Sequence, residues 1–535
     1  MMNLNSPDKI SPLRSFLKGR VLFMVGIILF FIIFLIYPVL HIVGVAFRPS
    51  GQFSLSLFQL MFENPVIRES IWNSFKIGIM VTVLASCVSL PLALFFHRYK
   101  FPGKTLFQGL LLLPLIIPPF VGALGIRQVL APFGSVNLWL LDHQIISNPI
   151  DFLGESGLFG VIFLETLHLY PIMFLNLTAS LASLDPTYDE AAQNLGASPL
   201  RRFFTVTLPM ILPGYFAGSI LVFLWALTDL GTPLIFDYAR VMPMQIFNML
   251  QDMNTNPMGY GLVVLVLLLT LACFTMGKWW AGGKSIETQT RAFREHRETP
   301  LTGKEATQSW MVRYPILLMI YLYLLIVLLI SIFPHLTVLM NALAGQWFMT
   351  VLPEQWTLNH FKEVFTHPLA VSSIRNSLIL SFAAAFLDLV LGVGIAWIVA
   401  RKKVQGAWML DGLVMMALTV PGLVLAFGYL ACFSGTFLDA RVNPVPLLIL
   451  AYGIRRLPYV VRSAHAGFMQ SSAALEEASA SLGAAASYTF RKITLPLIVP
   501  HLLVGGLLAF SFSMLEVSDS LILAMLEKYY PLTKT

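Results

Sequence analysis

Charged residues are scarce in this chain of 535 residues. Asp, Glu, Lys and Arg together make up 11% of it, whereas hydrophobic residues make up 57% and the mean hydropathy is +0.78. Because a soluble domain carries about a quarter charged residues, this composition excludes an ordinary water-soluble core as the main architecture. The sequence therefore indicates an integral membrane protein that is embedded in the lipid bilayer.

Cysteine is almost absent as well. Cys87, Cys273 and Cys432 lie far apart in apolar segments, so they predict neither a disulfide framework nor a metal site. No group of His, Cys and Asp has the spacing of metal ligands, and no Ser/His/Asp arrangement indicates covalent catalysis. The formal charge of +7 is spread over the ends of apolar segments rather than gathered for nucleic acid. We expect no catalytic residue, no cofactor, no metal and no nucleic-acid partner.

Long apolar segments are abundant. About 20 apolar residues cross the hydrocarbon core of a bilayer as one helix. The first segment exceeds the apolar core of about 7–15 residues in a signal peptide, so we interpret it as a retained span. The pattern predicts an all-α polytopic membrane protein with about 11 transmembrane helices. These lie near residues 21–47, 71–96, 106–131, 159–183, 212–235, 259–280, 315–339, 376–400, 408–433, 446–468 and 501–526.

Basic residues predict the orientation of these spans. They gather after the second span (Arg98, Lys104), after the fourth (Arg201, Arg202) and after the sixth (278–313). The positive-inside rule places such loops in the cytoplasm. All three loops lie on that side of the membrane if the N-terminus is cytoplasmic too. We therefore expect a multi-pass protein of the cell inner (cytoplasmic) membrane with a cytoplasmic N-terminus.

The second half of the chain repeats the first. The offset between matched residues is 303 at first and 287 later, so the first copy carries about 16 additional residues near 142–155. An even number of spans before a cytoplasmic linker makes the repeats parallel rather than inverted. Matched pairs include Asn73/Asn376, Arg98/Arg401, Pro118/Pro421, Gly125/Gly428 and Pro171/Pro458.

The repeat predicts three parts. Residues 1–280 form a first repeat of six spans, 281–313 a polar cytoplasmic linker, and 314–535 a second repeat of five spans. A partner for the span at 259–280 would lie beyond residue 535. Either the second repeat has five spans, or the chain is shortened at its C-terminus and the complete protein has about 12; we favour the shortened chain.

One moderately polar stretch occurs in both halves. We name Asp185–Pro213 loop 1 and Ser471–Pro500 loop 2. Asp185-Pro186 predicts a helix start, Gly196 predicts its end, and Ser198-Pro199 predicts a second short helix to about Thr207. A single loop of this kind could be an ordinary interfacial helix, but two matched copies favour a docking surface for a two-fold partner. The matched residues are Glu190/Glu477, Gly196/Gly483, Pro209/Pro496 and Pro213/Pro500.

Both loops carry one spaced motif. It runs Glu-Ala-Ala, three residues, Gly, nine residues, then Ile-x-Leu-Pro. Loop 1 has Val206 in place of Ile, and loop 2 has Ser479 in place of the second Ala. The copies are Glu190-Ala191-Ala192, Gly196 and Val206-Thr207-Leu208-Pro209, then Glu477-Ala478-Ser479, Gly483 and Ile493-Thr494-Leu495-Pro496.

In this motif the chain resembles the permease subunits of binding-protein-dependent ABC importers. The single chain with two repeats resembles the ferric-iron and thiamine importer permeases, and the ferric-iron type more closely. The resemblance implies that the loops dock onto an ABC ATPase subunit, present in two copies, and that an extracytoplasmic binding protein delivers the solute. It assigns this coupling role to Glu190, Ala191, Gly196, Pro209, Glu477, Ala478, Gly483 and Pro496.

The chain is not expected to be an enzyme. A P-loop needs Gly, four residues, then Gly-Lys-Ser/Thr after a strand. Gly283-Lys284-Ser285 would need Gly at Lys278, and Gly103-Lys104-Thr105 would need it at Arg98. ATP hydrolysis must therefore come from a separate subunit.

A few charges lie inside apolar segments, where they are costly and mark functional candidates. Asp229 and Glu516 occupy matched positions after the loops. They could line the pathway or act as a gate, or they could be acids at the outer interface with access to water. For Glu165, for Asp388 and for His168, which Arg455 matches, we favour structural pairing over contact with the solute.

The sequence thus predicts the transmembrane permease of an ATP-driven ABC importer, with ferric iron as the first solute. Thiamine, phosphonate, polyamine or another small polar solute are the alternatives within this class. An ion-coupled secondary transporter and a membrane scaffold or sensor that does not transport are the alternatives from other classes. The doubled motif argues against the first of these, and the Pro/Gly-interrupted spans argue against the second.

Overall fold

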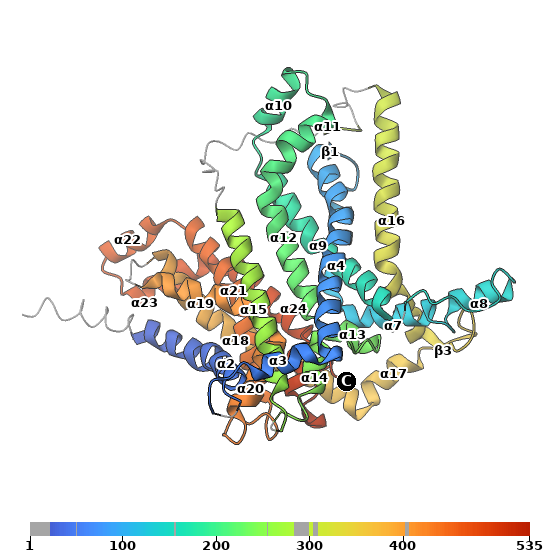
Figure 1. Cartoon of the computed structure of the whole chain (residues 1–535). Helices are drawn as coiled ribbons and strands as arrows, with labels where there is room; N and C mark the ends of the chain where they lie inside the picture. The colour runs from blue at the N-terminus through green and yellow to red at the C-terminus, as the bar shows by residue number, and fades with distance from the viewer. Residues whose placement is uncertain are drawn as a thin grey trace, which may run out of the picture. The chain divides into compact units, whose positions relative to one another are not determined.

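A computed structural model describes residues 22–49, 51–154, 157–253, 255–282, 299–302, 309–401 and 406–535. Figure 1 draws the helices of the chain, and contacts divide the chain into two compact units. Unit 1 comprises Met1–Leu57, Leu250–Leu267 and His367–Thr535, and unit 2 comprises Phe58–Met249 and Leu268–Thr366. Each unit is described by itself.

Helices dominate both units. Through the first repeat the elements are η2 (Ile32–Ile36), α2 (Tyr37–Phe47), α3 (Ser56–Glu63), α4 (Pro65–Arg98), β1 (Tyr99–Lys100), α5 (Lys104–Leu111), α6 (Leu113–Ile116), α7 (Pro119–Leu130), α8 (Ser135–Asp142), α9 (Leu158–Ala182), α10 (Pro186–Asn194), α11 (Pro199–Arg202), η4 (Phe203–Thr207), α12 (Leu208–Thr228), α13 (Gly231–Ile235), α14 (Met242–Asn248) and α15 (Met258–Gly282). They continue with β2 (Thr299–Pro300), α16 (Trp310–Leu343), β3 (Ala344–Gln346), β4 (Gln355–Trp356), α17 (Asn359–Thr366), α18 (Pro368–Arg401), α19 (Ala407–Thr419), α20 (Gly422–Phe433), α21 (Val445–Gln470), α22 (Ala473–Ser481), α23 (Ala486–Thr489), η5 (Phe490–Thr494), α24 (Leu495–Met514), α25 (Ser518–Leu523) and η6 (Glu527–Tyr529).

Within the described residues, eight helices are long and apolar enough to cross a membrane, or up to ten if each of two bent pairs is one span. The predicted all-α polytopic fold is confirmed. The predicted span near 446–468 is helix α21, which is not among these ten. It is a helix of 26 residues, but Arg455, Arg456 and Arg462 make it more highly charged than the helices counted as candidate spans.

Each bent pair breaks at a proline that the repeat matches. The first pair bends by 89° before Pro119 and the second by 99° before Gly422. Ile117 and Val420, which precede Pro118 and Pro421, have extended backbones with ψ of 131° and 117°. A residue before proline is driven out of the helical region by the proline ring, so the matched prolines explain both breaks.

Unit 2 is built on helices α4, α9 and α12, which pack together. Helix α16, from the second half of the sequence, packs beside α7. Further along α16, the Tyr323 hydroxyl donates to Val88 O over 3.1 Å and the Tyr321 hydroxyl donates to Pro102 O over 3.0 Å. A helix from the second half therefore completes the unit that holds most of the first repeat.

Unit 1 has the corresponding arrangement. Helices α18, α21 and α24 pack together, and α2, from the start of the sequence, packs against α20. The Tyr429 hydroxyl of α20 donates to Phe34 O over 2.8 Å. Unit 1 thus includes residues 1–57 and 250–267 of the first sequence repeat, and unit 2 includes residues 314–366 of the second. The repeat boundaries at 280 and 314 concern the sequence and stay a prediction.

The predicted linker, 281–313, lies mostly outside the described residues. Among its described residues, Thr299–Pro300 form β2, which pairs in parallel with β1 at the end of α4. The N–H of Leu301 donates to Lys100 O over 3.0 Å, and the Leu301 side chain is buried. This short pairing fixes the end of the linker beside loop 1. A second pair, β3 with β4, is antiparallel.

Candidate functional site

Loop 1 begins with a capped helix, α10. Asp185 Oδ1 accepts a hydrogen bond from the N–H of Thr187 over 2.9 Å, and Pro186 occupies the first helical position. The helix ends at Gly196, whose φ of +79° lies in the left-handed region that glycine adopts most easily. The helix start and the turn predicted from the sequence are therefore confirmed.

The second helix of loop 1 differs from the prediction. It begins at Pro199, as expected, but it does not end near Thr207. Helix α11 continues through the π-helical turn η4 directly into α12. The N–H of Leu208 donates to Phe203 O, five residues earlier, while Pro209 has no N–H to offer the preceding turn. Loop 1 is consequently joined to the following span by unbroken helix.

Loop 2 has the same elements in the same order. Ser472 caps α22 by accepting from the N–H of Ala474 over 3.3 Å, and Gly483 turns the chain with a φ of +83°. Helix α23 and the π-helical turn η5 then lead into α24. The two loops therefore match in local geometry as well as in sequence.

The residues to which the sequence assigns a coupling role all lie at the surface. They are Glu190, Ala191, Gly196, Pro209, Glu477, Ala478, Gly483 and Pro496. Leu195 and Leu482, which the motif did not indicate, are the most exposed large hydrophobic residues of the two loops, at 88% and 89%. The signal for them was present, since each precedes the glycine of its turn. Both loops thus expose a large apolar side chain directly before the glycine turn.

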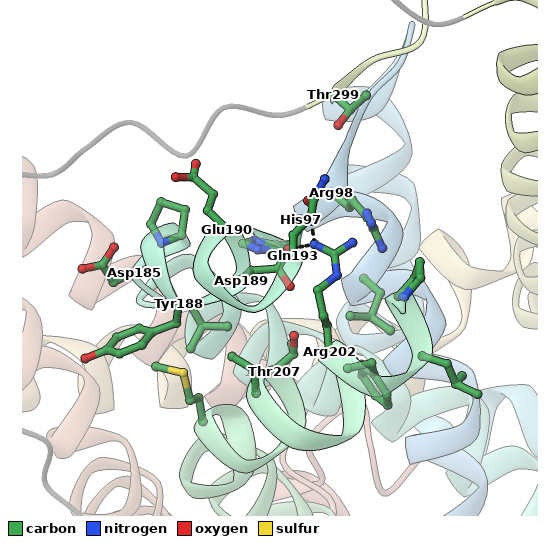
Figure 2. A pocket seen from close by; sticks show the side chains of 18 of the residues that line it. His97, Arg98, Asp185, Tyr188, Asp189, Glu190, Gln193, Arg202, Thr207 and Thr299 are labelled. Carbon is green, nitrogen blue, oxygen red and sulfur yellow. Dashed lines mark hydrogen bonds and ion pairs between the residues drawn. The ribbon is translucent and has the colours of Figure 1, made fainter. Parts of the chain in front are cut away.

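A cavity of about 760 Å³ with both polar and apolar lining residues lies beside loop 1 (Figure 2). The end of α4, helices α10 and α11, and the start of α12 form its walls, and Thr299 of β2 lies at its edge. Arg202 of α11 binds α10, because its Nη1 donates to Asp189 Oδ2 over 2.7 Å and to Gln193 Oε1 over 2.9 Å. Helix α10 is thereby tied to α11 of its own loop.

The intramembrane acids of unit 2 lie where α12 ends. The N–H of Thr232 donates to Asp229 Oδ2 over 2.8 Å, which caps the short helix α13. The Thr232 hydroxyl donates to Glu165 Oε1 over 2.8 Å, and Glu165 is buried. His168 Nδ1 lies 2.8 Å from Pro114 O, close to the break of the bent span. The helix break after α12 therefore gathers these groups.

The matched place in unit 1 holds an ionic cluster instead. Arg455 Nη1 lies 2.8 Å from Glu516 Oε1 and 3.0 Å from Asp519 Oδ2, and Arg456 also pairs with Glu516. The favoured pairing of Arg455 is thus observed, whereas both carboxylate oxygens of buried Asp388 have no hydrogen-bond partner among the described residues. Glu516 itself is 6% exposed. The pathway or gate role of Asp229 and Glu516 stays a prediction.

The bent spans, the doubled loop and the two polar clusters define a polytopic permease built of two repeats. The family described as "Binding-protein-dependent transport system inner membrane component" matches residues 89–282 and 389–524. Each match contains one loop, and together they cover more than half of the sequence. The chain belongs to this family, and it is a multi-pass permease of the bacterial inner membrane.

Relatives resemble the chain over most of its length. It is 27% identical to the ferric transport system permease protein FbpB of Actinobacillus pleuropneumoniae, over 94% of this chain and 71% of that one. It is 25% identical to the Fe(3+)-transport system permease protein FbpB 2 of Haemophilus influenzae, over 87% of this chain and 83% of that one. A solved bacterial ABC transporter that imports alginate covers 51% of this chain and 100% of its own, with 18% identity and a TM-score of 0.41.

The family match and the two ferric permeases place the chain among the permeases of ABC importers. Such permeases are not enzymes themselves, since the ATPase is a separate subunit. The family description also names a binding protein as the component on which transport depends.

Proposed function

We propose that the chain forms the membrane pathway of an ATP-driven importer for ferric iron. The observation that carries the proposal is the resemblance, over 94% of the chain, to a permease named for ferric transport. That relative and the FbpB 2 permease match across both halves of the chain. The solute is thus suggested by the fused two-repeat permeases of the family.

The geometry of the loops supports ATPase docking. Each loop presents an exposed acid, an exposed leucine and a left-handed glycine turn in one arrangement. Two copies of one motif with the same order of elements suit two ATPase subunits. Because helix continues from α11 through η4 into α12, and from α23 through η5 into α24, movement of a loop displaces the span that follows it.

The mechanism that follows uses two remote sites to bias one two-state element. A binding protein loaded with solute docks on the outer face. ATP binding closes the two ATPase subunits at the cytoplasmic loops, and the spans switch so that the pathway opens outward. Hydrolysis returns them to the inward state. In this scheme the N-terminus is cytoplasmic, and Asp229 and Glu516 gate the pathway from the breaks after α12 and α24.

The test is uptake in proteoliposomes. The chain is expressed with the ATPase and the binding protein encoded beside it, and ATP-dependent uptake of radioactive ferric iron is measured. We expect uptake that needs both ATP and the binding protein. ATPase activity stimulated by another loaded binding protein, without iron uptake, would move the solute to thiamine, phosphonate or polyamine. Uptake that survives ATP depletion and follows an ion gradient would overturn the proposal.

A further inference from the structure

The two loops hold their matched acids in different ways. Asp189 of loop 1 and Glu476 of loop 2 stand at the same place in the repeat, 287 residues apart. Asp189 is bound by Arg202, which belongs to its own loop and lies 13 residues away. Glu476 Oε1 instead accepts from Nε of Arg401 over 3.1 Å, and Arg401 is the last residue of α18.

Arg401 holds more than the acid. Its Nη2 donates to Ser471 O over 2.5 Å and to Ser471 Oγ over 2.7 Å, and its guanidinium lies 5.9 Å from the centre of the Phe468 ring. The side chains of Arg401 and Glu476 are only 11% and 19% exposed. Charge-assisted hydrogen bonds shielded from water in this way are stronger than an exposed ion pair. Arg401 therefore fastens the end of α18 to α22 and to the end of α21.

The first repeat has an arginine at the matched place but not the same partners. Arg98 corresponds to Arg401; it is exposed and lines the cavity beside loop 1 (Figure 2). The places of Phe468 and Ser471 are taken by Leu181 and Leu184, whose side chains offer neither an aromatic face nor a hydroxyl.

The contact that closes each loop from within also differs between the two repeats. Arg202, which binds the acid of loop 1, is replaced in loop 2 by Thr489. Its hydroxyl lies 2.8 Å from Ser479 Oγ, and both groups are buried. Loop 2 is therefore closed by a pair of hydroxyl groups, which leaves Glu476 available to a helix outside the loop.

We propose that Arg401 is a positioning residue that transmits the movement of α22 to helix α18, a part that the matched Arg98 does not play toward loop 1. Loop 1 acts on α12 through α11 and η4. Loop 2 acts on α24 in the same way and on α18 through Arg401 as well. The inference rests on the proposed function, in which the loops receive the movement of the ATPase.

Helix α18 is suited to carry such a movement. It has 34 residues, which corresponds to about 51 Å at 1.5 Å per residue. It packs against both α21 and α24. Near its other end, Asn376 Nδ2 donates to Lys528 O over 2.9 Å and to Tyr530 O over 3.1 Å. A displacement at Arg401 therefore reaches the opposite end of unit 1 through one helix.

The experiment compares Arg401→Ala with its matched control, Arg98→Ala. Each variant is purified with the ATPase and the binding protein, and uptake of ferric iron and ATP hydrolysis are measured together in proteoliposomes. We expect Arg401→Ala to retain the ATPase and to hydrolyse ATP, while the iron carried per ATP falls about tenfold. Arg98→Ala should keep this ratio within about twofold of the unchanged protein.

A charge exchange separates positioning from simple folding. Arg401→Glu combined with Glu476→Arg restores the pair with reversed charges, so iron carried per ATP should recover relative to Arg401→Glu alone. Equal ratios for Arg401→Ala and Arg98→Ala, with the ATPase still bound, would overturn the inference and leave the proposed function standing. Failure of the unchanged chain to bind the ATPase would overturn the proposed function itself.

Discussion

Gly125 and Pro334 lie so close that a Cβ atom on Gly125 would stand 2.1 Å from the carbonyl oxygen of Pro334. This approach places α16 against α7 inside unit 2. The matched glycine of the second repeat, Gly428, is less tight, because its Cβ would stand 3.0 Å from Pro38 Cβ and 3.3 Å from Pro38 O. The matched glycines thus each pack against a long helix of their own unit, and the space for a Cβ atom is smaller at Gly125 than at Gly428.

Gly125→Ala should therefore destabilise the protein more than Gly428→Ala. Real Cβ atoms do not approach a backbone oxygen to 2.1 Å, so α16 must move, at a cost of about 1–3 kcal/mol or more. Gly44→Ala is the control, because nothing lies within 4 Å of a Cβ there. Thermal unfolding in detergent measures the effect. An equal melting temperature for Gly125→Ala and Gly44→Ala would contradict the packing described.

The glycine turns of the loops give a second prediction. Gly196→Pro combined with Gly483→Pro should abolish co-purification of the ATPase while the protein still inserts. Proline holds φ near −65°, whereas these positions have φ of +79° and +83°, so both turns must refold. Gly435→Pro is the control, since Gly435 also has a positive φ, +72°, but lies outside the loops. Normal co-purification of the double variant would refute the coupling assignment.

The exposed leucines give a third prediction. Leu195→Asp with Leu482→Asp should leave folding unchanged, because both side chains are already in solvent. A buried apolar anchor can carry much of the binding energy of an interface, so we expect ATPase affinity to fall at least about tenfold. Phe437→Asp is the control, since Phe437 is 92% exposed and lies in another loop. An unchanged affinity would exclude the leucines from the docking surface.

The intramembrane acids give a fourth prediction, in which two matched residues behave differently. Glu516→Gln removes the partner that Arg455 and Arg456 share, and breaking a buried pair costs about 3–5 kcal/mol. Asp229→Asn keeps an oxygen that can cap α13 at Thr232, so the fold should persist. If Asp229 gates the pathway, this variant will change iron uptake. Melting temperature and uptake, measured on both variants, separate the two roles.

Local features were predictable from the sequence because their causes are local. Apolar runs indicated the spans, Asp185-Pro186 and Gly196 indicated the ends of α10, and a constant offset indicated the repeat. The continuous helix through η4 was not predicted, since a π-helical turn has no composition of its own. The sequence suggested a helix end near Thr207 where the structure has none.

Long-range contacts between helices could not be predicted from the sequence, for a different reason. Nothing in the apolar run of α16 distinguishes α7 as its neighbour, because lipid-facing and helix-facing positions are both apolar. The contacts of Arg401 were missed in the same way. Its match to Arg98 suggested equivalence, but its contacts depend on Phe468 and Ser471, which lie about 70 residues further along the chain.

The matched π-helical turns indicate which features of the loops are older than the duplication of the repeat. The turns η4 and η5 occupy positions that correspond at the same offset of 287 residues, so the common ancestor of the two repeats already had this turn. The additional residues near 142–155 are confined to the first repeat, and Arg202 stands against Thr489. These differences arose after the repeats diverged. The shape shared by the two loops is therefore ancestral, and their unequal fastening is the more recent change.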